Sequence, residues 1–264
     1  MRYFLLLFIS VTLLFSQISE RKIDSDILDE ASGLLISKKY PGVFWSHNDS
    51  GDMARLYAFD MKTLKLIKKI KVKKAKNKDW EDLTYYRGNI VIGDFGNNKN
   101  KRKKLKVYTI KEPNPYKEKK AKLMSKQKFI FSDQKNSPYR RKNFDCEAIF
   151  SFNDKLFLLS KHRADTNTTL YRLQGDVARK IMQYTLDDRV TSADSDGKHI
   201  VILTYKSIYL IEPKTGDDKI FNYPVKQKVL GDVGQVEGVA INEDKVYIIS
   251  EDGKFYTMDM KDIK

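Results

Sequence analysis

Two adjoining stretches decide the fold of this 264-residue chain: Asp79-Trp80-Glu81-Asp82-Leu83 and, shortly after it, Asn89-Ile90-Val91-Ile92-Gly93-Asp94. An acidic residue with a small or acidic neighbour enters a short apolar strand, a turn follows, and a second apolar strand ends on a charged group. Variants of this layout recur along the chain, so we interpret it as the signature of one repeat unit.

Four further segments share the entry pattern of Trp80–Thr84. They are Ala31–Leu35, Cys146–Phe150, Thr191–Ser195 and Val236–Ala240. Aligned on Ser32, Glu81, Glu147, Ser192 and Glu237, they follow one another at steps of 49, 66, 45 and 45 residues. Three of the four steps fall near the roughly 40–50 residues of a four-stranded propeller blade.

The pattern predicts an all-β fold, a single β-propeller with five blades. In each unit the second apolar run is continuous, as in strands buried on both faces, the third tends to alternate, and the fourth is more polar. Fourth strands are expected at 65–72, 126–132, 179–186 and 219–225.

The fifth unit lacks a fourth strand. The segment before Ser32, with Ile23 and Ile27-Leu28, is expected to complete this unit and so remove the open edge of the ring. The 66-residue step holds an insertion, 112–122, which we interpret as a loop, although a sixth blade is the alternative.

The first residues predict export. The apolar run from Phe4 to Phe15 is shorter than the ~20 residues that span a bilayer, so residues 1–19 are interpreted as a signal peptide and 20–264 as the propeller domain. We expect a periplasmic or extracellular monomer with no transmembrane span once the signal is removed. Cys146 is the only cysteine, so no intramolecular disulfide can form.

The chain is strongly basic, with 50 Lys and Arg against 35 Asp and Glu and a net charge of +15. The cations are mostly lysines on many turns, densest at 68–78 and 99–106, where they alternate with apolar residues or lie in loops. This is typical of solvated strand faces, and nucleic acid is not an expected partner. Attraction to anionic surfaces or ligands stays open.

The aligned entry residues predict a site on the axis, because the innermost strands of a propeller begin around its central channel. Converging carboxylates repel one another and need protons, cations or a metal. Oxygen donors without Cys or His favour Ca²⁺ or Mg²⁺ over zinc, and Ca²⁺ tolerates irregular geometry. The candidate ligands are Glu81, Glu147, Glu237, Asp82, Ser32 and Ser192. The alternative is that each carboxylate fastens a neighbouring blade through a backbone N–H or a lysine.

A second ring of residues is expected where the second strands end on the same face. It comprises His47, Asn48, Asp49, Asp94, Lys161, His162, Lys206 and Glu251. His47 and Asp94 are candidate general bases, and Lys161, His162 and Lys206 are candidates to bind an anionic group beside the metal. No phosphate-binding glycine loop and no Gly-x-Ser-x-Gly elbow is present.

Several motifs occur in combination: Ser32-Gly33-Leu34, His47-Asn48-Asp49-Ser50-Gly51, Asp79–Leu83, Gly93–Asn98, Glu147-Ala148-Ile149, Val190–Asp194 and Gln235–Ala240. Together they resemble a bacterial family of exported, functionally uncharacterised β-propellers, across nearly the whole mature chain. The chain departs from that family at Asn97-Asn98, where an Asp-Asn pair is common. A weaker likeness is to the calcium-activated nucleotidase (apyrase) propellers, which implies a central calcium held by acidic residues; fold similarity alone transfers no function.

Two functions follow as expectations. In the first, a central Ca²⁺ polarises a phosphate or other ester while a rim base activates water, making the protein a metal-assisted hydrolase. In the second, the propeller is a non-enzymatic binding or scaffold module of the cell envelope. The expected partner is accordingly a small anionic ligand or an envelope protein or glycan.

Overall fold

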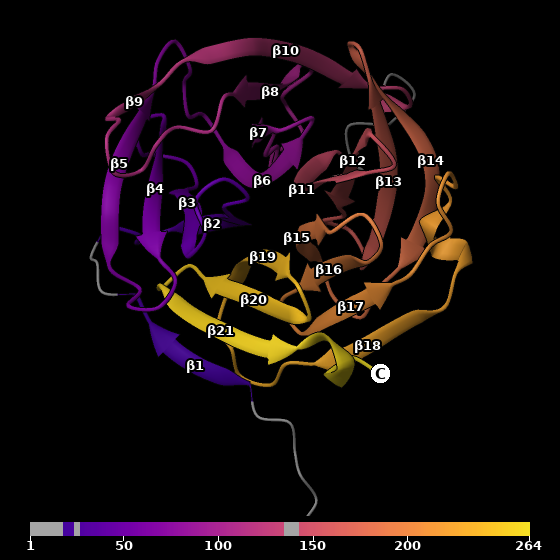
Figure 1. The fold of residues 1–264 in the computed structure, drawn as a ribbon. Coiled ribbons are helices and arrows are strands. Elements are labelled where there is room, and N and C mark those ends of the chain that lie inside the picture. The colour runs from indigo at the N-terminus through magenta and orange to yellow at the C-terminus, as the bar shows by residue number, and fades with distance from the viewer. Residues whose placement is uncertain (1–17, 24–26, 135–142) are drawn as a thin grey trace, which may run out of the picture.

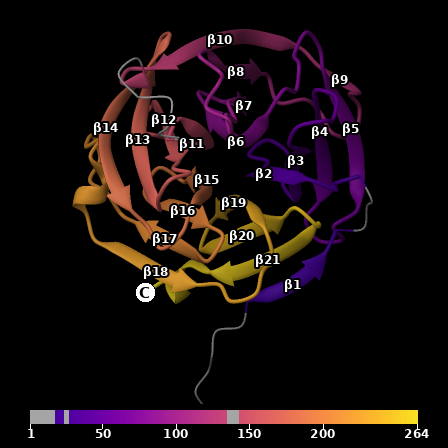
Figure 2. The same cartoon turned by 180° about the vertical axis from the view of Figure 1, so that it is seen from behind.

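A computed structural model describes residues 18–23, 27–134 and 143–264 of the chain. Its strands are arranged radially around a central axis, and Figures 1 and 2 show the ring from its two sides. Within the described residues the helical elements are short 3₁₀ turns, and none of the helices is long and apolar enough to cross a membrane. The predicted β-propeller fold is confirmed. Most of the predicted signal peptide lies outside the described residues.

The strands form successive antiparallel units. The first contains β2 (Ala31–Ile36), β3 (Val43–Asn48), β4 (Arg55–Asp60) and β5 (Leu66–Val72). The second contains β6 (Trp80–Tyr86), β7 (Asn89–Asp94), β8 (Leu105–Ile110) and β10 (Leu123–Phe131). The third contains β11 (Asp145–Phe152), β12 (Lys155–Lys161), β13 (Asn167–Gln174) and β14 (Val177–Thr185). The fourth contains β15 (Val190–Ser195), β16 (Ile200–Thr204), β17 (Ser207–Ile211) and β18 (Val225–Val229).

The last unit is closed by the other end of the chain. It contains β19 (Val236–Asn242), β20 (Lys245–Ser250) and β21 (Lys254–Asp259), and its outer strand is β1 (Ser19–Lys22), antiparallel to β21. An N-terminal strand therefore completes the last blade, as predicted, and covers the edge of β21. The strand lies earlier than expected and begins at Ser19, the last residue of the predicted signal peptide. Ile23 and Leu28 are instead buried in the core.

The core lies between neighbouring units. Leu35 and Trp45 of the first unit pack with Trp80 and Tyr108 of the second, and similar apolar clusters fill each further junction around the ring. The ring closes through Phe44 on β3, which stacks on Phe255 of β21. The inner and second strands are apolar on both faces because both faces meet another unit.

Two outer-strand predictions need correction. The insertion is not only a loop, since β9 (Lys120–Ala121) pairs parallel with β5 of the preceding unit. The fourth strand expected at 219–225 is a 3₁₀ turn at Ile220–Asn222 followed by β18. Pro224 lies between them and lacks the N–H that a ladder hydrogen bond needs.

Candidate functional site

Each innermost strand carries a β-bulge at the same level. The register shifts lie between Ser32 and Leu34, Trp80 and Asp82, Cys146 and Ala148, Val190 and Ser192, and Val236 and Gly238. The residues inside the bulges are Gly33, Glu81, Glu147, Thr191 and Glu237. A bulge re-aims a side chain, and three of these five positions hold a glutamate. The sequence alignment was one residue off at Ser32 and Ser192.

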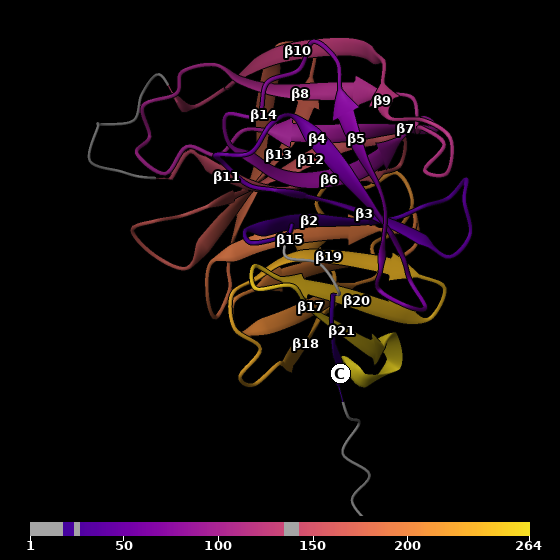
Figure 3. The ribbon, with the colours of Figure 1, turned by 90° about the vertical axis from the view of Figure 1, so that its left-hand side faces the viewer.

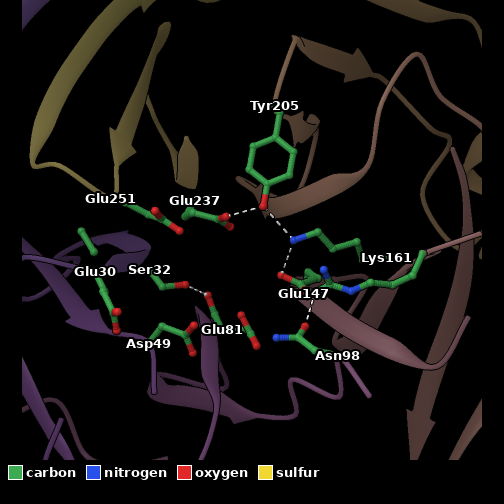
Figure 4. A pocket seen from close by; sticks show the side chains of 12 residues that line it. Glu30, Ser32, Asp49, Glu81, Asn98, Glu147, Lys161, Tyr205, Glu237 and Glu251 are labelled. Carbon is green, nitrogen blue, oxygen red and sulfur yellow. Dashed lines mark hydrogen bonds and ion pairs between the residues drawn. The ribbon is translucent and has the colours of Figure 1, made fainter. Parts of the chain in front are cut away.

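A polar cavity of about 170 Å³ opens on the axis where these glutamates meet (Figure 4). Its lining residues are Glu30, Ala31, Ser32, Asp49, Glu81, Asn98, Glu147, Lys161, Arg163, Tyr205, Glu237 and Glu251. The structure thus brings together four of the predicted ligands, Glu81, Glu147, Glu237 and Ser32. Ser32 Oγ donates to the backbone oxygen of Glu81 at 2.6 Å.

One side of the cavity is acidic. Oxygens of Asp49, Asp79 and Glu81 lie within 4.8 Å of one another, and Glu81 is only 5% exposed. Burial raises the pKa of Glu81 well above its usual value, and the carboxylates of Glu147 and Asp49 raise it further. The pKa of Asp49 is raised to about 7, first by burial and then by Asp79.

The Glu81 carboxylate has no hydrogen bond or salt bridge to any residue in the described ranges. Asp49 Oδ1 is likewise buried without a hydrogen-bond partner there, while Asp79 lies 3.6 Å from Arg102. Gly96 closes this side, because a Cβ at that position would collide with Glu81 Oε1 and with the Asp79 carboxylate. The backbone therefore leaves room for two carboxylates to approach one point.

The opposite side of the cavity holds its own cations. Lys161 Nζ lies 3.1 Å from Glu147 Oε2 and donates to the Tyr205 hydroxyl at 2.9 Å, and that hydroxyl donates to Glu237 Oε1 at 2.6 Å. Burial alone would lower the pKa of Lys161, but Glu147 and Glu237 outweigh it and raise the pKa. Arg163 contacts Asp145 at 2.6 Å and Asn98. Glu147 and Glu237 are thus partnered by other side chains, whereas Glu81 has no such partner among the residues that the structure describes.

Asp82 and Ser192 fasten the inner strands together and do not line the cavity. The Asp82 carboxylate accepts the backbone N–H of Ile149 at 3.0 Å and of Ala193 at 3.3 Å, and Ser192 Oγ at 3.1 Å. Ser192 Oγ in turn accepts the N–H of Val239 at 3.1 Å. The alternative given above, in which axial side chains fasten neighbouring blades, therefore holds for Asp82 and Ser192. The structure removes both from the candidate ligand set.

Neither candidate general base reaches the cavity. His47 is fully buried, its Nδ1 lies 3.0 Å from the backbone oxygen of Asn48, and its Nε2 faces Gly33. Burial lowers the pKa of His47 to about 4. Asp94 is buried in contact with Arg102 at 2.7 Å and Lys106 at 3.2 Å.

Of the three candidate anion-binding residues, only Lys161 lines the cavity. His162 lies 2.9 Å from Asp165 and 3.0 Å from Thr169 Oγ1, and Lys206 is an exposed residue 3.5 Å from Asp188. Sequence reasoning missed Glu30 and Asp79 because both precede the inner strand instead of lying in it. Each of the two residues directly precedes an aligned entry segment, and this position was the signal that could have identified them.

No family model matches the sequence, and no curated protein matches it. Solved structures do match. Virginiamycin B lyase from Staphylococcus aureus is 11% identical with a TM-score of 0.44, over 87% of this chain and 66% of that one. The β-propeller domain of Cps50 (Swd1) from Myceliophteria thermophila is 10% identical with a TM-score of 0.48, over 92% of this chain and 99% of that one. The Pan2 WD40 domain from Neurospora crassa is 8% identical with a TM-score of 0.41, over 87% and 62%. Residue roles cannot be transferred at these identities, and the more specific family resemblances stay predictions.

Proposed function

We propose that this protein is a calcium-binding β-propeller whose axial cavity holds Ca²⁺ between Asp49, Asp79 and Glu81. The observation that carries the proposal is the Glu81 carboxylate, which is almost completely buried, directed into the cavity and unpaired within the described residues (Figure 4). A buried charge without a partner is costly. A cation at this point would stabilise Glu81 and would also engage the unpartnered Asp49 Oδ1.

The chemistry of the donors favours calcium. All three side chains offer carboxylate oxygens, which are ligands for hard cations, whereas zinc prefers Cys and His. The bulged backbone and the unequal strand entries offer an irregular cage, which Ca²⁺ accepts more readily than Mg²⁺. Extracellular modules bind Ca²⁺ with dissociation constants of about 10⁻⁴–10⁻³ M, and the signal peptide predicted for residues 1–19 would export this chain to such a medium.

The geometry supports a binding role more than hydrolysis. Ester hydrolysis beside the metal needs a base within hydrogen-bond reach of the attacking water, and neither His47 nor Asp94 lines the cavity. Of the carboxylates that line the cavity, Asp49 and Glu81 are proposed metal ligands, while Glu147 is held by Lys161 and Glu237 by Tyr205. The remaining two are Glu251, which contacts Gln235, and Glu30, which is exposed to solvent. We therefore favour a calcium-dependent binding module of the cell envelope, with a small anionic ligand or an envelope protein or glycan as partner.

Calorimetric titration of the chelator-treated protein with Ca²⁺ tests the proposal. One binding event of submillimolar to millimolar affinity is expected, with weaker binding of Mg²⁺ and a higher melting temperature in Ca²⁺. Glu118→Gln, at an exposed carboxylate on the outer wall, should behave as the native protein does. If the native protein gives neither heat nor a thermal shift with about 10 mM Ca²⁺, the calcium function is wrong.

A further inference from the structure

The positive charge of the molecule is concentrated in one part of the chain. Residues 65–128 hold 22 Lys and Arg against six Asp and Glu, while the rest of the chain holds 28 against 29. The whole basic excess therefore comes from this segment. Of its six acidic residues only Glu118 is exposed.

The segment builds the outer wall of the first two units, through β5, β9 and β10 (Figures 1 and 3). Apolar and basic residues alternate along β5, so one face of the strand packs in the core and the other forms the wall. Ile70 and Val72 on β5 face the core, whereas Lys69 and Lys71 on the same strand are exposed. The basic wall is separate from the acidic axial cavity.

Five lysines of this wall have no acidic partner in the described part of the chain. Lys69, Lys71, Lys119, Lys120 and Lys122 form no salt bridge to any residue that the structure describes. Lys71 and Lys120 are register partners on adjacent parallel strands, which lie about 4.8 Å apart. Like charges at this spacing repel, so the wall carries an electrostatic cost that an anionic partner would relieve.

Two exposed apolar side chains lie among these lysines. Tyr116 and Met124 flank β9, and each is 57% exposed. They are half of the four large hydrophobic residues that are exposed in the described chain. Lysines around a tyrosine and an aliphatic side chain match the interface of a bilayer, where the ring and the methylenes enter the headgroup region while the ammonium groups meet lipid phosphates.

The cation type argues against sequence-specific or bidentate phosphate recognition. Only two arginines lie in the segment, and both are already ion-paired, Arg87 with Asp154 and Arg102 with Asp94. The available cations are lysines, which act as compact point charges and lack the planar fork of arginine. Bases of single-stranded nucleic acid would need a row of aromatic stacking platforms, and Tyr116 is the one exposed aromatic side chain among the described residues of the wall.

We propose that the wall formed by β5, β9 and β10 docks on a bilayer that contains anionic lipid, with Tyr116 and Met124 entering the headgroup region. This inference is independent of the calcium site. The binding is peripheral and reversible, and it weakens as salt screens the lysines.

Flotation with lipid vesicles tests the inference. The full chain is mixed with vesicles of phosphatidylcholine alone or with about a quarter phosphatidylglycerol, at low and high salt. Binding is expected only to the anionic vesicles and is expected to fall with salt. Lys119→Gln/Lys120→Gln/Lys122→Gln should weaken binding on the order of a hundredfold, about fivefold for each lysine. Tyr116→Ser/Met124→Ser should weaken it by about tenfold and leave the salt dependence unchanged.

The matched control is Lys198→Gln/Lys214→Gln/Lys219→Gln, which removes three exposed lysines from the fourth unit. It should bind within about twofold of the native protein. Failure of the native protein to bind anionic vesicles overturns the inference, and so does an equal loss for the two lysine triples. If heparin competes fully while the Tyr116/Met124 variant binds vesicles as the native protein does, the partner is a soluble polyanion and the bilayer assignment is wrong. Unfolding of each variant, followed by circular dichroism, separates lost docking from lost folding.

Discussion

The carboxylate of Asp82 on β6 accepts the backbone N–H of Ile149 on β11 at 3.0 Å, and it also accepts hydrogen bonds from Ser192 and Ala193 on β15. One side chain near the axis therefore joins the inner strands of three units. Burial raises the pKa of Asp82, and the hydrogen bonds from Ile149 and Leu83 act in the opposite direction. The carboxylate serves as a structural acceptor for donors that would otherwise be buried without a partner.

Asp82→Ala should destabilise the protein by about 3–5 kcal/mol, because it leaves the N–H groups of Ile149 and Ala193 unsatisfied at about 1–3 kcal/mol each and opens a cavity. Urea unfolding followed by fluorescence measures the change. Asp244→Ala, at an exposed position on the turn between β19 and β20, is the control and should cost less than about 0.5 kcal/mol. Equal effects of the two substitutions would show that Asp82 does not fasten the ring.

Much of this architecture could be predicted from the sequence because the inner strands of each unit carry the sequence repeat. The entry motif around Glu81 and the apolar run Ile90–Ile92 fix an inner and a second strand in each unit, and both recur with strand-like burial. The outer strands were harder to place, because they are half exposed and their apolar and polar residues follow no strict pattern. The strand β9 has only two residues, and its pairing with β5 depends on tertiary contact.

The candidate site was predicted only in part, because a one-residue register change alters what a side chain meets. Glu81 and Asp82 are adjacent, yet Glu81 lies in the bulge and enters the cavity while Asp82 bonds to neighbouring backbone. Nothing in the sequence alone indicates which strand position bulges. For the same reason Ser192 was aligned with the axial glutamates, although Thr191 occupies the bulge.

Glu81→Gln should abolish the calcium response. Without calcium the variant should be as stable as the native protein or more stable, because it removes a buried charge that Glu147 and Asp49 repel. With calcium its affinity should be at least about tenfold weaker. Differential scanning calorimetry in chelator and in Ca²⁺ gives both quantities. A variant that keeps the full thermal shift would exclude Glu81 as a ligand.

Gly96→Ala should have a similar effect without changing any charge. The added methyl would collide with Glu81 Oε1 and displace the Asp79 carboxylate, so the three oxygens could no longer converge. We expect calcium affinity to fall by about tenfold or more while the protein stays folded. Gly197→Ala, where a Cβ meets nothing but φ is +94°, is the control for backbone strain: it should lower stability and leave calcium affinity unchanged. Retained calcium binding in Gly96→Ala would mean that the metal lies elsewhere.

Stability in chelator should depend on pH through Asp194, whose carboxylate accepts the N–H of Ile241 at 2.9 Å and links β15 to β19. Burial raises its pKa from 3.8 to about 7. The folded protein therefore holds a proton that the unfolded chain releases, so this contribution to stability is complete below about pH 4 and is lost as the pH rises toward 7.

Asp194→Asn keeps the acceptor oxygen and removes the titration. The free energy of unfolding should then fall less steeply between about pH 4 and 7, by up to ~1.4 kcal/mol per pH unit. Urea unfolding across this range measures the slope for the native protein, for the variant and for Asp244→Asn, which should match the native protein. An unchanged slope in Asp194→Asn would contradict the assignment.

Closure of the ring should depend on β1. A chain that begins at Ile23 lacks the strand that pairs with β21, whereas a chain that begins at Ile18 keeps it. We expect the shorter chain to lose about 3–5 kcal/mol, since several ladder hydrogen bonds worth about 1 kcal/mol each disappear together with the bond from Arg21 to the backbone oxygen of Lys62. Arg21→Gln in the longer chain keeps the ladder and removes only the bonds from the Arg21 side chain to the backbone oxygens of Met61 and Lys62, and it should cost about 1 kcal/mol. The shorter chain should also associate at high concentration, which light scattering detects, because β21 then presents unpaired N–H and C=O groups along an exposed edge. Equal stability of the two chains would mean that packing between Phe44 and Phe255 holds the ring closed without the strand.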